Sequence, residues 1–112
     1  MRIPKRGDIF QVNLNPTSGH EQQGLRPVLV ITNKIFNQTG LIFICPITQG
    51  GNYARFAGFT VPLINCGTKT QGVILCNQVR TIDYNARKAM FIESVPSNVI
   101  DDVLARICAI LE

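Results

Sequence analysis

Short strand-like runs, separated by turn signals, constrain the fold of this chain more than any other feature of its sequence. The runs fall near residues 8–14, 26–32, 41–47, 58–63, 72–79 and 89–93. The first alternates apolar and polar residues, and the second is rich in β-branched residues, as strands are. Turn-forming residues separate the runs at 50–52, 65–67 and 83–85. Strands of this length and spacing are typical of a small antiparallel sheet or barrel.

One amphipathic helix is predicted near the C-terminus. Pro96 ends the preceding strand, Ser97 is a good N-cap residue, and Asp101 and Asp102 lie toward the positive end of the helix dipole. An apolar stripe with helical spacing consists of Ile100, Val103, Leu104, Ile107 and Leu111. Because this stripe needs a surface to cover, we expect a mainly β fold, a small barrel closed by the C-terminal helix. Residues 33–39 are compatible with an additional helical turn.

Length and composition indicate one globular domain over residues 1–112. The chain is 46% hydrophobic and only 16% charged, which argues against disorder. No apolar run approaches the roughly 20 residues that a membrane span needs. Residues 1–6 lack the apolar core of a signal peptide. We therefore expect a cytoplasmic protein that does not enter a membrane.

The four cysteines are expected to be buried free thiols. Cys45, Cys66, Cys76 and Cys108 form no Cys-x-x-Cys pair, and the chain has one histidine. Metal sites usually need close ligand pairs, so no metal or other cofactor is expected. A disulfide framework is not expected in a cytoplasmic chain with this much core.

The net charge of +4 is unevenly distributed. Residues 1–95 carry ten Lys and Arg against four Asp and Glu, which gives +6. Residues 96–112 carry one against three, which gives −2. A basic body on a small domain suits a polyanionic partner, nucleic acid above all, although ordinary solubility would also explain it.

The segment 19–27 concentrates reactive side chains. It places His20, Glu21 and Arg26 within seven residues on a glycine-punctuated loop between two predicted strands. An acid, a base and a cation held by strands suit acid–base chemistry on a phosphate or a carbonyl. The simpler interpretation is a polar turn that keeps a hairpin soluble.

Several ordered blocks of the sequence resemble the MazF/PemK family, the toxins of type II toxin–antitoxin pairs, which includes Kid and ChpB. The blocks are residues 6–9, 16–22, 26–30, 46–48, 50–59, 72–73, 77–83 and 86–87. The resemblance implies an SH3-like barrel of the CcdB/PemK type with a long terminal helix, and a homodimer. It also implies sequence-specific, metal-independent cleavage of single-stranded mRNA, in which a 2′-oxygen attacks the adjacent phosphate and leaves a 2′,3′-cyclic phosphate.

The resemblance assigns the catalytic residues. Arg26 matches the family arginine and would stabilise the transition-state charge, since a guanidinium suits a phosphate bidentately, with proton donation to the leaving oxygen as an additional role. Thr48 matches a phosphate-positioning threonine. His20 and Glu21 compete for the role of base, with orientation of Arg26 as an alternative role for Glu21.

One departure from part of the family restricts this mechanism. Several relatives carry aspartate where this chain has Asn77, and Kid-like members carry arginine where it has Leu75. Asn77 cannot accept a proton, so catalysis is expected to depend on Arg26 and Thr48.

Contacts to RNA are expected from amides, cations and an aromatic ring, because single strands are bound by stacking and by hydrogen bonds to base edges. The predicted contact residues are Asn52, Arg55, Phe56, Lys69, Gln71, Asn77, Gln78, Arg80 and Arg87. Tyr53 and Phe56 would otherwise close the barrel, and Arg80 and Arg87 would otherwise pair with Asp83.

The expected partners follow from the same resemblance. They are RNA, a second copy of the chain, and a cognate antitoxin with an acidic, disordered C-terminal segment. Operator DNA would be contacted only through the antitoxin. Arg26, Arg55 and Arg80 would bind both the antitoxin and RNA. One alternative is a CcdB-like poison of DNA gyrase, although that group relies on a C-terminal tryptophan and this chain has none. Another is a passive RNA-binding barrel.

Overall fold

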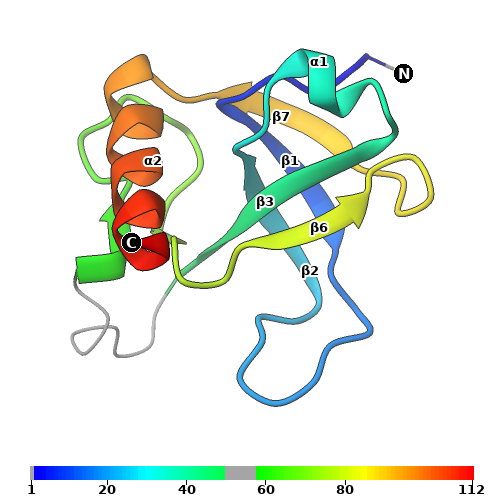
Figure 1. Cartoon of the computed structure of the whole chain (residues 1–112), viewed down its shortest axis with the longest axis horizontal. Helices are drawn as coiled ribbons and strands as arrows, with labels where there is room; N and C mark the ends of the chain where they lie inside the picture. Colours follow the sequence, from blue (N-terminus) through cyan, green and yellow to red (C-terminus); the bar gives the residue numbers. More distant parts are fainter. Residues whose placement is uncertain (1, 50–57) are drawn as a thin grey trace.

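The computed structural model describes residues 2–49 and 58–112, and in this part of the chain it shows a curved sheet of short strands beside a C-terminal helix (Figure 1). The strands are β1 (Asp8–Asn13), β2 (Leu25–Val30), β3 (Leu41–Thr48), β4 (Thr60–Pro62), β5 (Val73–Leu75), β6 (Arg80–Asp83) and β7 (Met90–Ser94). The helices are α1 (Lys34–Asn37) and α2 (Ser97–Leu111). The predicted mainly β class with a C-terminal helix is confirmed. Strand β6 was not predicted. A single strand was predicted over 72–79, but only its residues 73–75 form a strand, β5.

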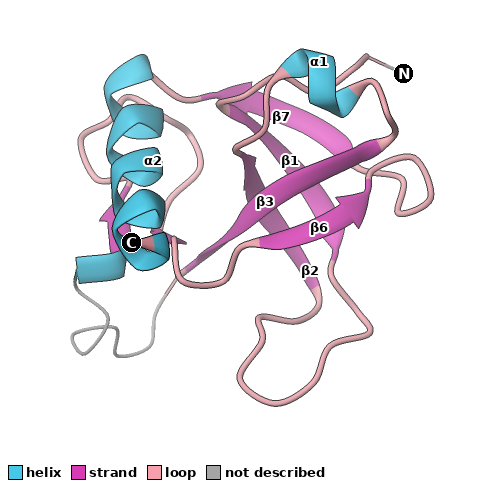
Figure 2. Ribbon diagram, viewed as in Figure 1, coloured by secondary structure: helices cyan, strands magenta, loops and turns pink. Residues whose placement is uncertain are grey.

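The long strand β3 joins the two parts of the sheet. The antiparallel order is β4-β5-β3-β2-β1-β7, and β6 also pairs with β3. Leu41–Ile44 of β3 pair with β6, whereas Ile47 and Thr48 pair with β5. Among the described residues β4 and β7 do not pair with each other, so the sheet is barrel-like without a closed ring of hydrogen bonds. Helix α2 lies at the β4 side of the molecule (Figure 2).

The last three residues of β2, Val28–Val30, are buried and face both sides of the sheet, which explains why this end of the strand is continuously apolar. Val28 and Val30 lie in the cluster inside the sheet, together with Phe10 and Ile44. Leu29 lies in the second cluster, between the sheet and α2. The site described below therefore rests on strands that are anchored on both sides.

Helix α2 begins one residue earlier than predicted. Pro96 is the N-cap residue, in extended conformation, and no side chain caps the helix, so the prediction of Ser97 as N-cap is wrong. Pro96 suits this boundary because its fixed φ ends the strand. Asp101 and Asp102 lie beyond the first turn, which holds no acidic residue, so they are farther from the positive end than expected.

The apolar stripe of α2 is largely confirmed. Ile100 and Val103 are buried against the sheet, Leu104 and Ile107 pack beside them, and Val99 joins the core without having been predicted. Leu111 is 79% exposed, because the last turn of α2 extends past the sheet. The predicted turn at 33–39 forms α1, whose Asn33 side chain accepts a hydrogen bond from the Phe36 amide.

All four cysteines are free thiols, and two are buried as expected. Burial raises the pKa of Cys45, and the neighbouring Cys76 raises it further. Burial also raises the pKa of Cys76, to about 11, with Arg106 lowering it and Asp102 raising it. Both thiols therefore stay protonated and unreactive at neutral pH. Cys66 is half-buried and Cys108 is exposed, so the prediction of burial is wrong for Cys108, which faces away from the core.

Two features of the described residues bear on function. None of their helices is both long and apolar enough to cross a membrane. Within residues 2–49 and 58–112, no three side chains of His, Cys, Asp or Glu are grouped so that they could hold a metal ion.

Candidate active site

The sheet brings Arg26 and Thr48 together. Arg26 is the second residue of β2 and Thr48 is the last residue of β3, and the antiparallel register of these strands sets them opposite each other. The Arg26 Nη1 donates to Thr48 Oγ1 over 3.2 Å, and its Nε donates to the Gln23 carbonyl over 2.8 Å. Two of the five guanidinium N–H groups thus fix the fork, and the other three are available to an oxyanion.

The position of Thr48 depends on a close approach by Gly72. Thr48 is only 5% exposed and pairs with Val73 of β5. Gly72 precedes that pair with φ of +118°, a conformation that glycine adopts readily. A Cβ at Gly72 would lie 2.4 Å from the Thr48 carbonyl oxygen. Only glycine therefore allows the segment that leads into β5 to pass so close to the end of β3.

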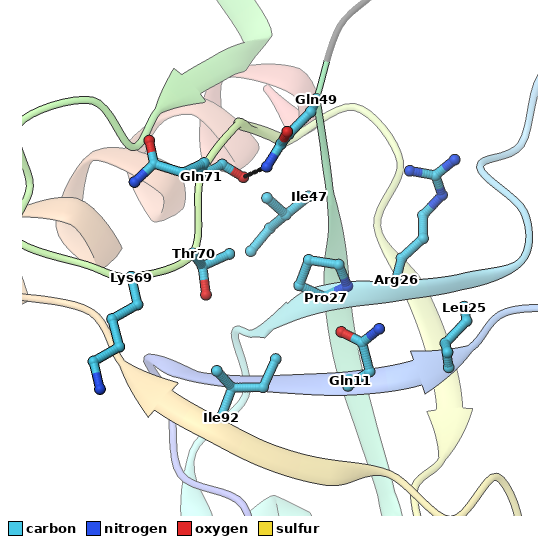
Figure 3. Close-up of a pocket in the computed structure, with 10 residues that line it drawn as sticks. All are labelled: Gln11, Leu25, Arg26, Pro27, Ile47, Gln49, Lys69, Thr70, Gln71 and Ile92. Atoms are coloured by element: carbon cyan, nitrogen blue, oxygen red, sulfur yellow. Dashed lines mark hydrogen bonds between the residues drawn. The ribbon is translucent and has the colours of Figure 1, made fainter.

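A pocket of about 400 Å³ opens beside Arg26 (Figure 3). Part of its wall is apolar and includes Ile47, Ile92 and Pro27. The other lining residues, mostly polar, are Gln11, Leu25, Arg26, Gln49, Lys69, Thr70 and Gln71. Gln49 Nε2 donates to the Gln71 carbonyl over 3.5 Å and joins two sides of the rim. The apolar side chains suit the faces of a flat ring, and the amides suit its polar edges. The cations suit a negatively charged group attached to that ring.

Glu93 on β7 holds the loop that forms the basic side of this pocket. Its carboxylate accepts hydrogen bonds from the Lys69 amide and from both the amide and the hydroxyl of Thr70. Partial burial raises the pKa of Glu93, but these hydrogen bonds, led by that of the Thr70 hydroxyl, and the Lys69 charge together lower it below its usual value. Glu93 is thus a carboxylate at neutral pH, and it keeps Lys69 and Gln71 at the rim.

His20 and Glu21 lie on the exposed loop between β1 and β2. The Glu21 carboxylate accepts from the Ser18 amide over 2.5 Å and from its hydroxyl over 3.5 Å, so it is turned toward its own loop. Among the described residues the ion pairs are Arg2–Asp8 and Arg106–Asp102. The expectation that Glu21 orients Arg26 is therefore wrong, because the arginine is already held by uncharged acceptors.

Three side chains from the region of β6 hold the β1–β2 loop. Gln78 contacts it at residues 20 and 22, Arg80 Nη2 donates to the Pro16 carbonyl over 3.4 Å, and Arg87 Nη1 donates to two loop carbonyls. The alternative that Arg80 and Arg87 pair with Asp83 is wrong, since Asp83 accepts from the Ala86 amide instead. Sequence patterns gave no signal for these contacts, because their partners are 56 to 74 residues apart.

The other predicted RNA contacts fall in three places. Lys69 and Gln71 line the pocket, as does Gln49, which the sequence analysis did not single out. Asn77 is exposed beside Gln78, just after β5. Residues 52–56, which include the predicted contacts Asn52, Arg55 and Phe56 and the alternative core residue Tyr53, lie outside the described residues.

Known proteins resemble this chain along nearly its whole length. The profile of a family described as PemK-like, MazF-like toxin of type II toxin-antitoxin system matches residues 5–111. The endoribonuclease PemK of Escherichia coli is 50% identical over 108 residues, which cover 96% of this chain and 81% of the relative. The endoribonuclease toxin ChpB of Escherichia coli K12 is 49% identical over 109 residues, 96% and 94% of the two chains.

Solved structures show the same architecture. The crystal structure of MazF from Deinococcus radiodurans superposes with a TM-score of 0.87 at 31% identity and covers 99% of this chain and 98% of that one. A MazE–MazF crystal structure from the same organism superposes with a TM-score of 0.81 at 31% identity, over 99% and 97% of the chains.

Proposed function

Because the chain belongs to the PemK-like, MazF-like toxins of type II toxin–antitoxin systems, we propose that it is an endoribonuclease that cuts single-stranded mRNA in the cytoplasm. The activity named for its relatives PemK and ChpB supports this function. The observation that carries the proposal is the Arg26–Thr48 pair at the edge of a pocket lined by a second cation, Lys69. The same relatives favour RNA cleavage over a gyrase poison.

The proposed reaction needs no metal. The 2′-hydroxyl of one nucleotide gives its proton to a base and its oxygen attacks the adjacent phosphorus. The bond to the 5′-oxygen breaks and that oxygen takes a proton from water, so the products carry a 2′,3′-cyclic phosphate and a 5′-hydroxyl. Arg26 stabilises the charge that develops on the phosphoryl oxygens, with its fork held by Gln23 and Thr48. The Thr48 hydroxyl positions the phosphate beside that fork. Donors that are fixed before the reaction need no reorganisation during it.

For the base we propose His20. The Glu21 carboxylate is turned back to Ser18, whereas the imidazole of His20 is exposed on the same loop. A neutral imidazole carries a lone pair on one ring nitrogen, so it can accept the 2′-proton. Glu21 then acts within the loop, where it orders the turn that carries His20.

The pocket beside Arg26 is the proposed binding site for a base next to the cut. Its apolar walls would contact the faces of the base, and the side chains of Gln49 and Gln71 would meet its edges. Lys69 is placed for a flanking phosphate, and Asn77 for a second nucleotide. Arg80 and Arg87, committed to loop carbonyls, would add positive charge to the RNA path.

RNA digestion in excess EDTA tests this function. Purified protein should cut a long transcript at a limited set of positions, and mass spectrometry of the fragments should show cyclic-phosphate and 5′-hydroxyl ends. DNA gyrase supercoiling should be unaffected in parallel. Intact RNA would overturn the enzyme proposal, and inhibition of gyrase alone would favour the CcdB-like alternative.

The proposed partner is an antitoxin whose acidic, disordered C-terminal segment folds on binding, with operator DNA reached only through it. The MazE–MazF structure supports an antitoxin protein as the partner. We also propose a homodimer, in which exposed apolar side chains such as Met90 and Leu111 are available to the second copy. Because the segment and RNA are both anionic, we expect them to compete for Arg26 and its neighbours.

A titration with fluorescent RNA checks this competition. A synthetic acidic segment of the antitoxin should displace RNA from the toxin, and Arg26→Ala should weaken both ligands. Undiminished binding of the segment to RNA-saturated toxin would contradict a shared surface.

A further inference from the structure

We infer that Gln78 is a positioning residue, which holds the His20 loop in place for cleavage rather than reading a base of the RNA. The inference rests on the proposed function and deepens it. Its basis is that both ends of the Gln78 amide are bound to the backbone of the loop between β1 and β2. Gln78 Oε1 accepts from the Gln22 amide over 2.8 Å, and Gln78 Nε2 donates to the His20 carbonyl over 3.2 Å.

The loop has few other restraints at this point. The Glu21 amide donates to the Ser18 carbonyl over 3.3 Å, and Leu14 and Gly24 join its two ends through a backbone hydrogen bond of 2.9 Å. Arg80 and Arg87 contact its other arm, at residues 13–16. Gln78 therefore binds the arm carrying His20 on both sides of Glu21, whereas the Arg26 Nε and the Asn15 side chain bind that arm farther along, at Gln23 and Gly24.

This geometry leaves Gln78 little capacity for RNA. A glutamine that reads adenine bidentately directs both its carbonyl and its amino group at the base. In this structure the carbonyl and one amino hydrogen are already satisfied by the chain itself. Gln78 is also half-buried, whereas its neighbour Asn77 is exposed. Asn77 is therefore the better placed of the two for contact with the substrate.

The expected consequence concerns the rate of cleavage and not the binding of RNA. A general base must stay within hydrogen-bond reach of the proton that it removes. A displacement of about 1 Å can reduce a rate on the order of 100-fold. Loosening the loop should therefore lower kcat and leave KM and the cut sequence nearly unchanged.

The test uses Gln78→Met, which keeps the length of the side chain and removes both hydrogen bonds. The matched control is Gln38→Met, because Gln38 is exposed at the end of α1, at the opposite end of the molecule from the β1–β2 loop (Figure 1). Cleavage of a short RNA bearing a mapped site is measured for both variants. We expect kcat to fall about 10- to 100-fold for Gln78→Met only, with KM within about twofold. Amide exchange of Gln22 should become faster in the same variant.

A double-mutant cycle with His20→Ala separates positioning from a general structural role. If Gln78 acts through His20, adding Gln78→Met to His20→Ala should cause little further loss of kcat. A raised KM or an altered cut sequence would overturn the inference and assign Gln78 to base recognition. Fully additive losses would overturn it as well. Failure of the wild-type protein to cut RNA would instead reject the proposed function itself, so the two failures are distinguishable.

Discussion

Arg26→Ala is expected to lower kcat for RNA cleavage by about 100- to 1,000-fold, the loss typical when one preorganised transition-state donor is removed. The guanidinium is held by the Gln23 carbonyl and the Thr48 hydroxyl before RNA arrives. Its remaining donors can therefore meet the phosphorane without a reorganisation cost. Arg26→Lys should recover only part of the activity, because an ammonium keeps the charge and loses the planar fork.

The control for Arg26 is Lys34→Ala, which changes the net charge by the same amount on exposed helix α1. Both substitutions should weaken RNA binding modestly at low salt, because each removes one positive charge. Only Arg26→Ala should lower kcat at saturating RNA. Equal effects of the two variants would mean that Arg26 contributes general attraction and not catalysis.

Gly72→Ala is expected to damage both the fold and the activity. The new Cβ would lie 2.4 Å from the Thr48 carbonyl oxygen and 2.9 Å from its carbon, so the end of β3 must move. The φ of +118° adds strain for any residue other than glycine. We expect a loss of about 1–3 kcal/mol in the free energy of unfolding, as for other overpacked sites. Displacement of Thr48 should reduce cleavage on the order of 100-fold in the protein that remains folded.

Gly58→Ala is the matched control, because no atom of the described residues lies within 4 Å of a Cβ added at Gly58, which has no positive φ. Thermal unfolding and cleavage of the same short RNA are measured for both variants. Wild-type stability and rate in Gly72→Ala would show that the approach to Thr48 is not required. Equal damage in Gly58→Ala would indicate a general intolerance of these loops instead.

The sequence predicted most of the strands because their burial leaves a pattern. The second half of β2 is continuously apolar since Val28, Leu29 and Val30 face core clusters on both sides. Strand β6 was missed because three of its four residues are polar and it sits beside a turn. The last turn of α2 was predicted to be buried because helical spacing continues to Leu111, although the sheet ends before it.

The candidate site was only partly predictable. Arg26 and Thr48 were identified by resemblance, and the register of β2 and β3 accounts for their contact. The contacts of Gln78 and Glu93 left no trace in the sequence, because each side chain binds backbone groups from a distant segment. The residue types alone favoured an RNA contact for Gln78 and indicated no role for Glu93.

A single 2′-deoxy nucleotide tests the central claim most directly. A short RNA is made with the sugar immediately 5′ of a mapped cut lacking its 2′-hydroxyl, and wild-type protein is added in excess EDTA. The proposed reaction begins at that hydroxyl, so the deoxy substrate should bind with nearly unchanged affinity and stay intact, while the all-ribose control is cut. Cleavage of the deoxy substrate at the same bond would contradict attack by the 2′-oxygen and the mechanism built on Arg26 and Thr48.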